Sequence, residues 1–353
     1  MYPQLLINKK KFSYNLDTTL DLCQKYNITL MAVTKVFCAE QELIEIINAS
    51  NTDFIADSRI ENLKSMSTNK QKVLLRIPSV HELYDVIKYV DISLNSELEV
   101  IRKLNKVAEQ HNVKHKIILM IDIGDLREGI YYKEDILKTI QAIKSLESIQ
   151  LEGIGTNLTC YGGIIPNLST LNKLVEVIKL SKSILNIDFK IISGGNSSHL
   201  HLLKDGYNIP YINNLRVGEA IVLGRETAFG ESIQDLYQDV FVLASDLIEV
   251  QFKPSIPEGD IGMNAFGQVP EFQDHGIIKR GIIALGKQDV DYHEIMPYDS
   301  KIRFIGSSSD HIIIDLTHSD KDYQVGDVIK FKLSYGSLLS LMTSKYVKKV
   351  YYE

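Results

Sequence analysis

Residues 28–49 read ITLMAVTKVFCAEQELIEIINA, and this stretch decides the fold. Its first part, 28–34, is a short run of apolar and β-branched residues, which predicts a buried strand. The second part, 39–49, places apolar residues three and four positions apart, which predicts a helix with one buried face. A strand followed by a helix of this length is typical of a parallel sheet, because the helix carries the chain back to the start of the next strand.

The same alternation of strand and helix patterns repeats up to about residue 220. We predict strands at 28–34, 53–56, 73–77, 90–94, 116–122, 151–157, 190–193 and 214–218. Crossover helices are expected at 39–49, 96–109, 132–146 and 168–185. Eight such units predict an α/β fold, a closed (β/α)8 TIM barrel, which we place at residues 11–231.

The pattern changes after residue 232. Strand-like runs at 239–247, 280–285, 301–305, 311–316, 328–332 and 345–351 are separated by Gly, Pro and Asp, and they predict a C-terminal all-β domain at 232–353. Residues 1–10 hold an N-terminal strand, at 4–7, that could join this domain. A length of 353 residues suits a large barrel with a smaller second unit.

Charge and composition exclude several functions. Lys+Arg 39 against Asp+Glu 45 gives a net charge of −6, so the chain has no positive excess for binding nucleic acid. No window approaches the roughly 18 apolar residues of a membrane span, and the first residues lack a signal-peptide pattern. We therefore predict a cytoplasmic protein with no membrane partner. Three widely spaced cysteines predict neither disulfides nor a zinc site, and no metal is expected.

Residues that directly follow the strands of a (β/α)8 barrel line its active-site mouth. In this chain they are mostly polar: Lys35, 57–59, Arg76, Asn95, Asp122, Arg127, 157–159, 193–197, Arg216 and Gly218. Surface loops are polar in any case, so the ring alone does not define a site. Lys35 is the most informative member, because desolvation at the end of a buried strand would leave its amine neutral and able to form a Schiff base. A structural lysine is the alternative interpretation.

The segment ISGGNSS at 192–198 follows the seventh predicted strand and opens a helix. Its glycines let a ligand approach the backbone, and its serine hydroxyls and amide groups can donate to a phosphate. The turn at 215–220 adds Arg216 and Gly218 beside it. Ordinary helix capping by Asn196 or Ser197 would explain the segment equally well if it stood alone. Together with Lys35, however, these features indicate a site for pyridoxal 5'-phosphate.

The chain resembles the alanine racemase-like, fold-type III pyridoxal phosphate enzymes over essentially its whole length, and most closely their ornithine racemase branch. The matching stretches are MAVTK (31–35), DIGDLREG (122–129), GTNLTCYG (155–162), SGGNSS (193–198), LRVGE (215–219), SSSDH (307–311) and SYG (334–336). The resemblance implies a pyridoxal phosphate-dependent amino-acid racemase, an isomerase. It also implies a head-to-tail homodimer, in which the barrel of one subunit meets the β domain of the other.

The resemblance also implies roles for individual residues. Lys35 is similar to the Schiff-base lysine that serves as one of two catalytic bases, and Arg216 to the arginine that meets the pyridine nitrogen. Phosphate contacts are implied for Asn196, Ser197, Gly218, the backbone of Glu219, and Tyr335. Arg127 matches an arginine that orients the cofactor's phenolic oxygen or the substrate carboxylate, and Asn157 replaces a ring-stacking histidine.

This sequence departs from the family at the second catalytic base. Alanine racemases carry a tyrosine in the block that here reads LGKQD, 285–289, so the tyrosine is absent. Lys287 could supply the second base if desolvation lowers its pKa, but it could equally be a solvated loop lysine. Weaker substitutes are Tyr292, Cys160 and the pair 310–311. Met120 stands where a carbamylated lysine would be, so that group is not expected.

These departures disfavour a plain alanine racemase and favour ornithine or a similar diamino acid. A distal ammonium needs a carboxylate partner once water is excluded. Candidate acids are Asp125, Glu128, Glu219, Asp289 and Asp310, and substrate contacts are expected from Arg127, Asp289, Ser309 and Asp310. The expected reaction interconverts L- and D-ornithine by two-base transfer of the α-proton through an external aldimine.

Three alternatives remain open at this point. One is an alanine or broad-specificity amino-acid racemase. Another is a decarboxylase or aldolase on the same fold, although the cysteine-containing block near the end of the decarboxylases is missing. The last is a pyridoxal phosphate-binding homeostasis protein without turnover, although those proteins lack a β domain.

Overall fold

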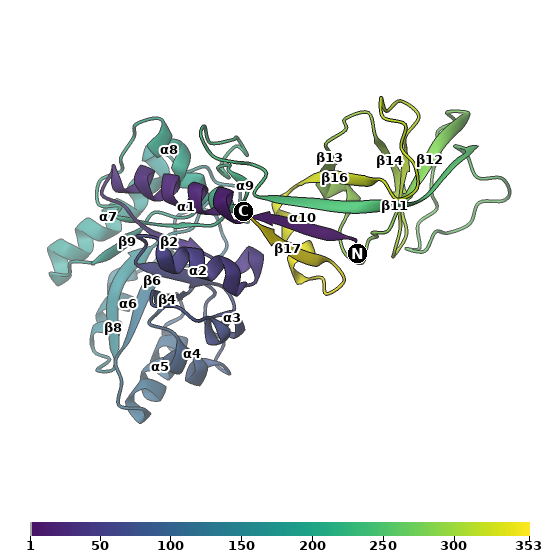
Figure 1. The fold of residues 1–353 in the computed structure, drawn as a ribbon. Helices are drawn as coiled ribbons and strands as arrows, with labels where there is room; N and C mark the ends of the chain where they lie inside the picture. Colours follow the sequence, from purple (N-terminus) through teal and green to yellow (C-terminus); the bar gives the residue numbers. More distant parts are fainter. Residues whose placement is uncertain (1) are drawn as a thin grey trace. The chain divides into compact units, whose positions relative to one another are not determined.

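The computed structural model describes residues 2–353, and in it the chain forms two compact units (Figure 1). One unit comprises Lys10–Gln238. The other combines the residues up to Lys9 with Asp239–Glu353. Among residues 2–353, no helix is both long and apolar enough to cross a lipid bilayer.

The Lys10–Gln238 unit is a closed barrel of eight parallel strands. In chain order these are β2 (Thr29–Val33), β3 (Phe54–Asp57), β4 (Gln71–Leu74), β5 (Ile92–Asn95), β6 (His115–Asp122), β8 (Ile149–Gly155), β9 (Ile191–Ser193) and β10 (Asn214–Val217). They are ordered β5-β4-β3-β2-β10-β9-β8-β6, and β5 pairs with β6 to close the ring.

Helices connect successive strands and lie around the outside of the barrel (Figure 1). They are α1 (Lys9–Gln24), α2 (Gln41–Ala49), α3 (Ile60–Ser65), α4 (Leu83–Tyr89), α5 (Leu98–Gln110), α6 (Ile136–Lys144), α7 (Leu168–Leu185), α8 (Leu200–Lys204) and α9 (Glu219–Leu223). Two short 3-10 helices, η1 (Lys35–Phe37) and η2 (Ser197–His199), follow β2 and β9.

The barrel interior is filled by apolar side chains from almost every strand. The buried cluster contains Met31, Val33, Ala56, Val73, Ile92, Leu94, Ile118, Met120 and Ile191. Close packing of these side chains leaves no channel through the barrel. Chemistry is therefore confined to the loops at the ends of the strands.

The boundaries of two predicted elements of the barrel differ most from those in the structure. The strand expected at 73–77 is β4, which ends at Leu74, so Arg76 lies beyond the strand end and forms an ion pair with Glu82 at 3.4 Å. The helix expected at 132–146 is the shorter α6. Residues Ile130–Tyr131 form strand β7 beside β6, and the Asp135 side chain caps α6 by accepting a hydrogen bond from the backbone N–H of Lys138.

The second unit is built on an eight-stranded, mainly antiparallel sheet. Its strands are β1 (Gln4–Asn8), β11 (Phe241–Pro254), β12 (Ile277–Ile283), β13 (Ile295–Pro297), β14 (Arg303–Ser307), β15 (Ile312–Asp315), β16 (Val328–Leu333) and β17 (Lys348–Tyr352). The main path is β13-β16-β11-β12-β15-β14. Strand β1 pairs with β11 and β17, so the N-terminal strand belongs to this sheet. A barrel followed by a sheet domain confirms the predicted fold class.

The sheet unit also contains helical turns that were not predicted, η3 (Tyr292–Glu294) and α10 (Tyr335–Thr343). Ser334 caps α10 by accepting a hydrogen bond from the Ser337 backbone N–H at 3.0 Å, and the Ser337 hydroxyl accepts one from the Ser334 N–H at 2.8 Å. This reciprocal capping starts the helix at Tyr335.

Candidate active site

Lys35 lies where the sequence predicted, at the mouth of the barrel just after β2. The buried Thr34 precedes it and fixes its position, because the Thr34 hydroxyl donates to Asp57 Oδ2 at 2.5 Å, at the end of the adjacent strand β3. Asp57 also accepts hydrogen bonds from the backbone N–H of Arg59 and the side chain of Asn62. Burial raises the pKa of Asp57, and these donors partly offset that effect.

The surroundings of Lys35 favour its neutral amine. Burial lowers the pKa of Lys35, and the positive charge of Arg127 lowers it further. Cys160, Asp57 and Glu128 act in the opposite direction. A lowered pKa increases the fraction of neutral, nucleophilic amine at a given pH, which favours Schiff-base formation.

The loop after β9 is held by Asn196, which caps η2. Its Oδ1 accepts from the Ser198 backbone N–H at 2.8 Å, while its Nδ2 donates to the Leu158 carbonyl at 2.9 Å. Asn196 therefore caps a helix, as one interpretation of the sequence expected. Its bond to Leu158 also connects the loop after β9 to the loop after β8. Ser197 is buried, and its Oγ accepts only a long hydrogen bond, 3.4 Å, from the Ala220 N–H in α9.

Arg216 is buried near the end of β10. Its Nη1 donates to Ser193 Oγ at 2.5 Å, and its Nη2 donates to the Thr156 carbonyl at 2.7 Å and to Asn157 Oδ1 at 3.3 Å. Burial lowers the pKa of Arg216 to about 10, so the side chain remains charged at neutral pH. The Nε–H takes part in none of these three bonds.

Gly218 and Glu219 start α9 next to Lys35. A Cβ at Gly218 would lie 3.1 Å from the Val33 side chain, so glycine allows β10 to end close against β2. Glu219 forms an ion pair with Arg225 at 3.0 Å. Burial raises the pKa of Glu219, and the charges of Arg225 and Lys35 oppose that rise.

The loop after β6 carries Arg127 and is cross-linked to the loop after β8. Asp125 accepts hydrogen bonds from the backbone N–H groups of Cys160, Tyr161 and Ile164. Arg127 donates to the Cys160 Sγ through Nη1 and to both carboxylate oxygens of Glu128 through Nε and Nη2. Both carboxylate oxygens of Asp125 are thus used in hydrogen bonds between the two loops. We therefore do not keep Asp125 as a candidate for binding a distal ammonium.

Several buried polar atoms near this mouth have no hydrogen-bond partner within residues 2–353. They are Asn95 Oδ1, Thr156 Oγ1, Asn157 Nδ2, Ser198 Oγ and His199 Nε2. Buried polar groups normally have partners. Their concentration after β5, β8 and β9 fits residues that receive a ligand with several polar groups, such as a phosphorylated cofactor.

The remaining predicted site residues lie in the sheet unit. The backbone N–H groups of Lys287 and Gln288 donate to the carbonyls of Ser308 and Ser309, each at 3.0 Å. Asp310 accepts from the Ser309 hydroxyl at 2.9 Å. The structure therefore brings Lys287, Ser309 and Asp310 into one pair of loops.

The other predicted residues of the sheet unit have different neighbours. Lys287 is exposed, with its amine 4.3 Å from the centre of the Phe266 ring. Asp289 accepts from the Ser344 hydroxyl at 2.6 Å, near the end of α10, and Tyr335 is the first residue of that helix. The Tyr292 ring packs against His293 and Phe304.

Two histidines near the mouth have structural partners. His199 Nδ1 lies 3.2 Å from the Gly194 carbonyl, and His201 Nδ1 lies 2.5 Å from the Ser198 carbonyl. Residues 2–353 hold no cluster of three or more His, Cys, Asp or Glu side chains placed to bind a metal ion.

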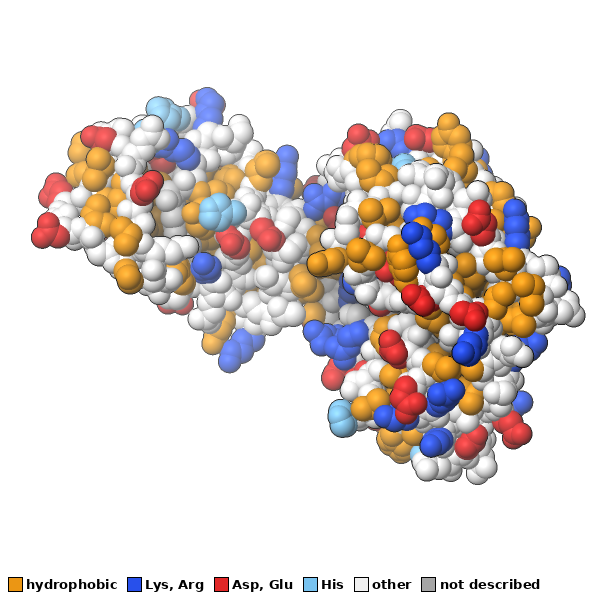
Figure 2. Space-filling model, turned by 180° about the vertical axis from the view of Figure 1, so that it is seen from behind, with side chains coloured by type: hydrophobic (Ala, Val, Ile, Leu, Met, Phe, Trp, Pro, Cys, Tyr) orange, Lys and Arg blue, Asp and Glu red, His pale blue; other side chains and the backbone are white. Residues whose placement is uncertain are grey.

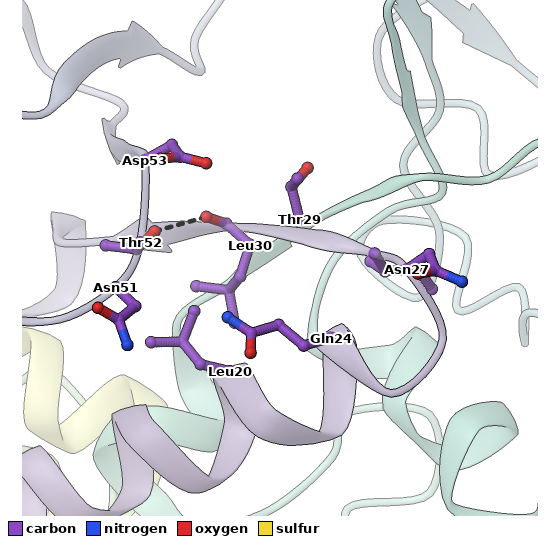
Figure 3. A pocket seen from close by; sticks show the side chains of 9 residues that line it. Leu20, Gln24, Asn27, Thr29, Leu30, Asn51, Thr52 and Asp53 are labelled. Atoms are coloured by element: carbon purple, nitrogen blue, oxygen red, sulfur yellow. Dashed lines mark hydrogen bonds between the residues drawn. The ribbon is translucent and has the colours of Figure 1, made fainter.

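A separate pocket of about 310 Å³ lies at the opposite end of the barrel strands (Figure 3). Leu20 and Gln24 of α1, Thr29 and Leu30 of β2, and the segment before β3 line it, with the Thr52 hydroxyl bonded to the Leu30 carbonyl at 2.7 Å. None of the predicted site residues lines this pocket.

From the sequence, Asp57 was expected only to line the barrel mouth, Thr34 had no role of its own, and Glu128 was considered only as a partner for a substrate amine. Asp57 could have been suspected, because an acid directly after a buried strand must find a partner. The contact between Arg127 and Cys160 had no sequence signal, since the two residues lie 33 positions apart.

A (β/α)8 barrel with a partly buried lysine directly after strand β2, two arginines and a polar loop after β9 defines a Schiff-base type of site. A family model described as alanine racemase, N-terminal domain, matches residues 7–226. The chain belongs to this family, which confirms the predicted family and the assignment to racemases.

Similar proteins cover the full length of the chain. An ornithine racemase from Acetoanaerobium sticklandii is 44% identical over 350 residues, covering 99% of both chains. A lysine racemase from Thermotoga maritima is 37% identical over 354 residues, also with 99% coverage of both.

Solved alanine racemases share the fold at low sequence identity. The enzyme of Clostridium difficile 630 has a TM-score of 0.75 at 17% identity and covers 100% of this chain and 96% of its own. The enzyme from Bartonella henselae, solved with covalently bound pyridoxal phosphate, has a TM-score of 0.74 at 18% identity, with 100% coverage of both chains.

Proposed function

We propose that this protein is a pyridoxal 5'-phosphate-dependent racemase that interconverts L- and D-ornithine. The observation that carries the proposal is the partly buried Lys35 amine at the barrel mouth directly after β2, where burial and the charge of Arg127 lower its pKa. The full-length similarity to an ornithine racemase supports the choice of substrate.

The residues at the mouth supply suitable contacts for the cofactor. Lys35 would bind it covalently, and Arg216 would contact the pyridine nitrogen. Arg127 would contact the phenolic oxygen, and Asn157 would lie against the ring in place of a stacking histidine. Asn196, Ser197, Gly218 and the backbone of Glu219 would hold the phosphate, and Tyr335 of the sheet unit is proposed as a further phosphate contact. When bound, the cofactor would delocalise the negative charge left on the substrate after its α-proton is removed.

Two bases on opposite faces of the substrate would move the α-proton. Lys35 suits one role because burial and Arg127 favour its neutral form. Lys287 is proposed for the other face, contributed by the sheet unit of a second copy in a head-to-tail homodimer. Arg216 does not release its proton, so it would fix the protonation state of the pyridine nitrogen rather than exchange protons.

A diamino acid would need a partner for its distal ammonium. Asp289 and Asp310 stay our candidates, with Arg127 and Ser309 as further substrate contacts, because Asp125 is occupied by three backbone N–H groups. Lysine is the second candidate substrate, since a relative at 37% identity is a lysine racemase. A cytoplasmic location is also proposed, and it agrees with the lack of disulfides among the three cysteines.

A substrate panel combined with chemical trapping tests this proposal. The protein with added pyridoxal phosphate would be incubated with L-ornithine, L-lysine and L-alanine, and the products separated by chiral chromatography. We expect D-ornithine to form fastest. Equal rates with alanine would contradict the diamino-acid assignment, and no racemisation of any substrate would contradict the function.

Borohydride reduction followed by peptide mapping locates the cofactor. We expect the reduced adduct on Lys35, and we expect Lys35→Ala to lose both the adduct and the activity. An adduct on another lysine would remove the central assignment.

A further inference from the structure

The Arg127 guanidinium has one of its two hydrogen-bonding edges filled by the next residue in the chain. Both carboxylate oxygens of Glu128 bind that edge, through Nε and Nη2, and the Glu128 side chain is only 18% exposed. A planar guanidinium bound in this two-point manner has little freedom to rotate. Glu128 therefore fixes the direction in which Arg127 presents its remaining donors.

The outer edge of Arg127, formed by Nη1 and Nη2, has only a weak partner. Its Nη1 donates to the thiol sulfur of Cys160, which is a poor acceptor. An incoming carboxylate accepts hydrogen bonds far better than a thiol, so it can take this edge with two parallel bonds. Arg127 follows β6 and Lys35 follows β2, so the edge and the reactive amine lie at the same end of the closed barrel. The charge interaction between the two side chains agrees with this placement.

The backbone around Glu128 is fixed as well. Asp122 Oδ1 accepts from the N–H groups of Gly124 and Leu126, which shapes the loop. Gly129 has a φ of +128°, and a Cβ there would lie 2.4 Å from the Asp122 nitrogen, so only glycine fits. Glu128 is thus held between two anchored segments, which is what a positioning residue requires.

We propose that Glu128 is a positioning residue that holds Arg127 so that its outer edge receives the substrate α-carboxylate beside Lys35. This inference rests on the proposed racemase function and adds a residue to it. It also takes Glu128 away from the alternative role of binding the distal ammonium, because both its oxygens face a guanidinium.

Glu128 also affects the pKa of the Lys35 amine through its charge. Arg127 favours the neutral amine, whereas Glu128 and Asp57 favour the charged one, and Glu219 interacts with Lys35 from α9. Without the negative charge of Glu128, the positive charge of Arg127 acts more strongly on Lys35. The Lys35 amine should then titrate at lower pH.

The test compares Glu128→Gln and Glu128→Asp with the matched control Glu134→Gln, an exposed acid of the same loop region. Each variant is loaded with pyridoxal phosphate and assayed for ornithine racemisation over a range of pH. Inhibition by 1,4-diaminobutane is measured in parallel, because this diamine lacks the α-carboxylate. Absorbance of the bound cofactor and thermal unfolding report loading and folding.

We expect Glu128→Gln to raise the KM for ornithine by about 10- to 100-fold, as misplacement of a clamping arginine does, with inhibition by the diamine changed by less than about threefold. Glu128→Asp should recover part of the affinity, and the acidic limb of the pH profile should move to lower pH in Glu128→Gln. The control should match the wild type.

Three outcomes would overturn the inference. A wild-type KM in Glu128→Gln would show that Arg127 needs no such support. Equal losses for ornithine and the diamine would place Glu128 at the distal amine instead. If Glu128→Gln fails to fold, Glu128→Asp takes its place in the test. A ratio of ornithine affinity to diamine affinity equal to that of the wild type in Glu128→Asp would then contradict the inference. Failure of the wild-type enzyme to racemise any amino acid would instead reject the proposed function, so the two failures are distinguishable.

Discussion

At the scale of single residues, the barrel mouth holds three basic side chains, Lys35, Arg127 and Arg216. They differ in how far nearby carboxylates balance their positive charge. Arg216 is buried among neutral acceptors, whereas Arg127 has the full carboxylate of Glu128. For Lys35, burial and the charge of Arg127 lower the pKa more than the nearby acids raise it. Of the three, Lys35 is thus the side chain that loses its proton most readily, because an amine begins from a lower pKa than a guanidinium and its surroundings lower that pKa further.

Replacement of Lys287 tests the second base. We expect Lys287→Ala to slow α-proton exchange by about 100-fold for one enantiomer of ornithine and far less for the other, because each base serves one face. Deuterium incorporation from D₂O, followed by NMR, measures both directions. Lys332→Ala is the matched control, since Lys332 is also exposed with its amine over a tyrosine ring. Unchanged exchange from both enantiomers would reject the role.

Two buried histidines should make the protein less stable in mild acid. Burial lowers the pKa of His115 and of His199 to about 4, below the 6.5 of an unfolded histidine. The unfolded chain therefore binds protons first, and the stability that is complete above pH 6.5 is lost as the pH falls towards 4. Between pH 7.5 and pH 5 each histidine should reduce the free energy of unfolding by about 2 kcal/mol.

Urea unfolding of the wild type and of His115→Gln at both pH values measures this effect. Glutamine can keep a hydrogen bond to Ser93, which lies 2.8 Å from His115 Nε2. We expect the variant to lose about 2 kcal/mol less than the wild type between the two pH values. An identical pH dependence would mean that His115 does not titrate in this range.

At the scale of elements, loops from different strands are fixed to one another by side chains rather than by long helices. Asp125 and Arg127 join the loop after β6 to the loop after β8, and Asn196 joins the loop after β9 to both Asn157 and Leu158. Hydrogen bonds therefore connect the loops after β6, β8 and β9 to one another, and these bonds fix the relative positions of the site residues in these loops.

Gly286 allows the loop of Lys287 to approach the loop of Ser309. A Cβ at Gly286 would lie 2.1 Å from the Ser309 carbonyl oxygen, so Gly286→Ala must push the two loops apart. We expect a loss of about 1–3 kcal/mol in the free energy of unfolding and a larger loss of racemase activity. Gly306→Ala is the control, because its Cβ would meet no atom within 4 Å. Similar behaviour of the two variants would mean that close approach of the loops is not needed.

At the scale of the whole molecule, the predicted site residues are divided between the barrel unit and the sheet unit. On the face drawn in Figure 2, acidic and basic side chains are interspersed over the surface rather than gathered by sign. The proposal of a head-to-tail dimer would let each barrel work with the sheet unit of a second copy.

Mixed dimers test that arrangement. Lys35→Ala chains, expected to be inactive, and Lys287→Ala chains, expected to be strongly impaired in racemisation, would be co-expressed with different tags. A mixed dimer would contain one site with both lysines intact and one with neither, so a random mixture should recover about one quarter of the wild-type activity. Activity no higher than that of the separate variants would contradict shared sites. Light scattering checks that the protein is dimeric.

Much of the fold could be predicted because strands and helices carry local periodic patterns. The runs at 28–34 and 214–218 became β2 and β10 with shifts of one residue at an end. Errors arose where local signals competed: apolar residues after Leu74 extended the predicted strand beyond β4, and α10 depends on a serine capping box with a weak pattern. Family, fold class and racemase assignment followed from motif blocks that the sequence carries in full.

The sequence by itself determined the order of strands and helices, the position of Lys35 at a strand end, and the polar residues that follow each barrel strand. These features depend on residues close together in the chain. Only the tertiary structure decided which of those residues meet: Thr34 with Asp57, Arg216 with Asn157, and Arg127 with Cys160. The reason is that closure of the barrel brings together loops far apart in sequence, and no local pattern encodes the distance between them.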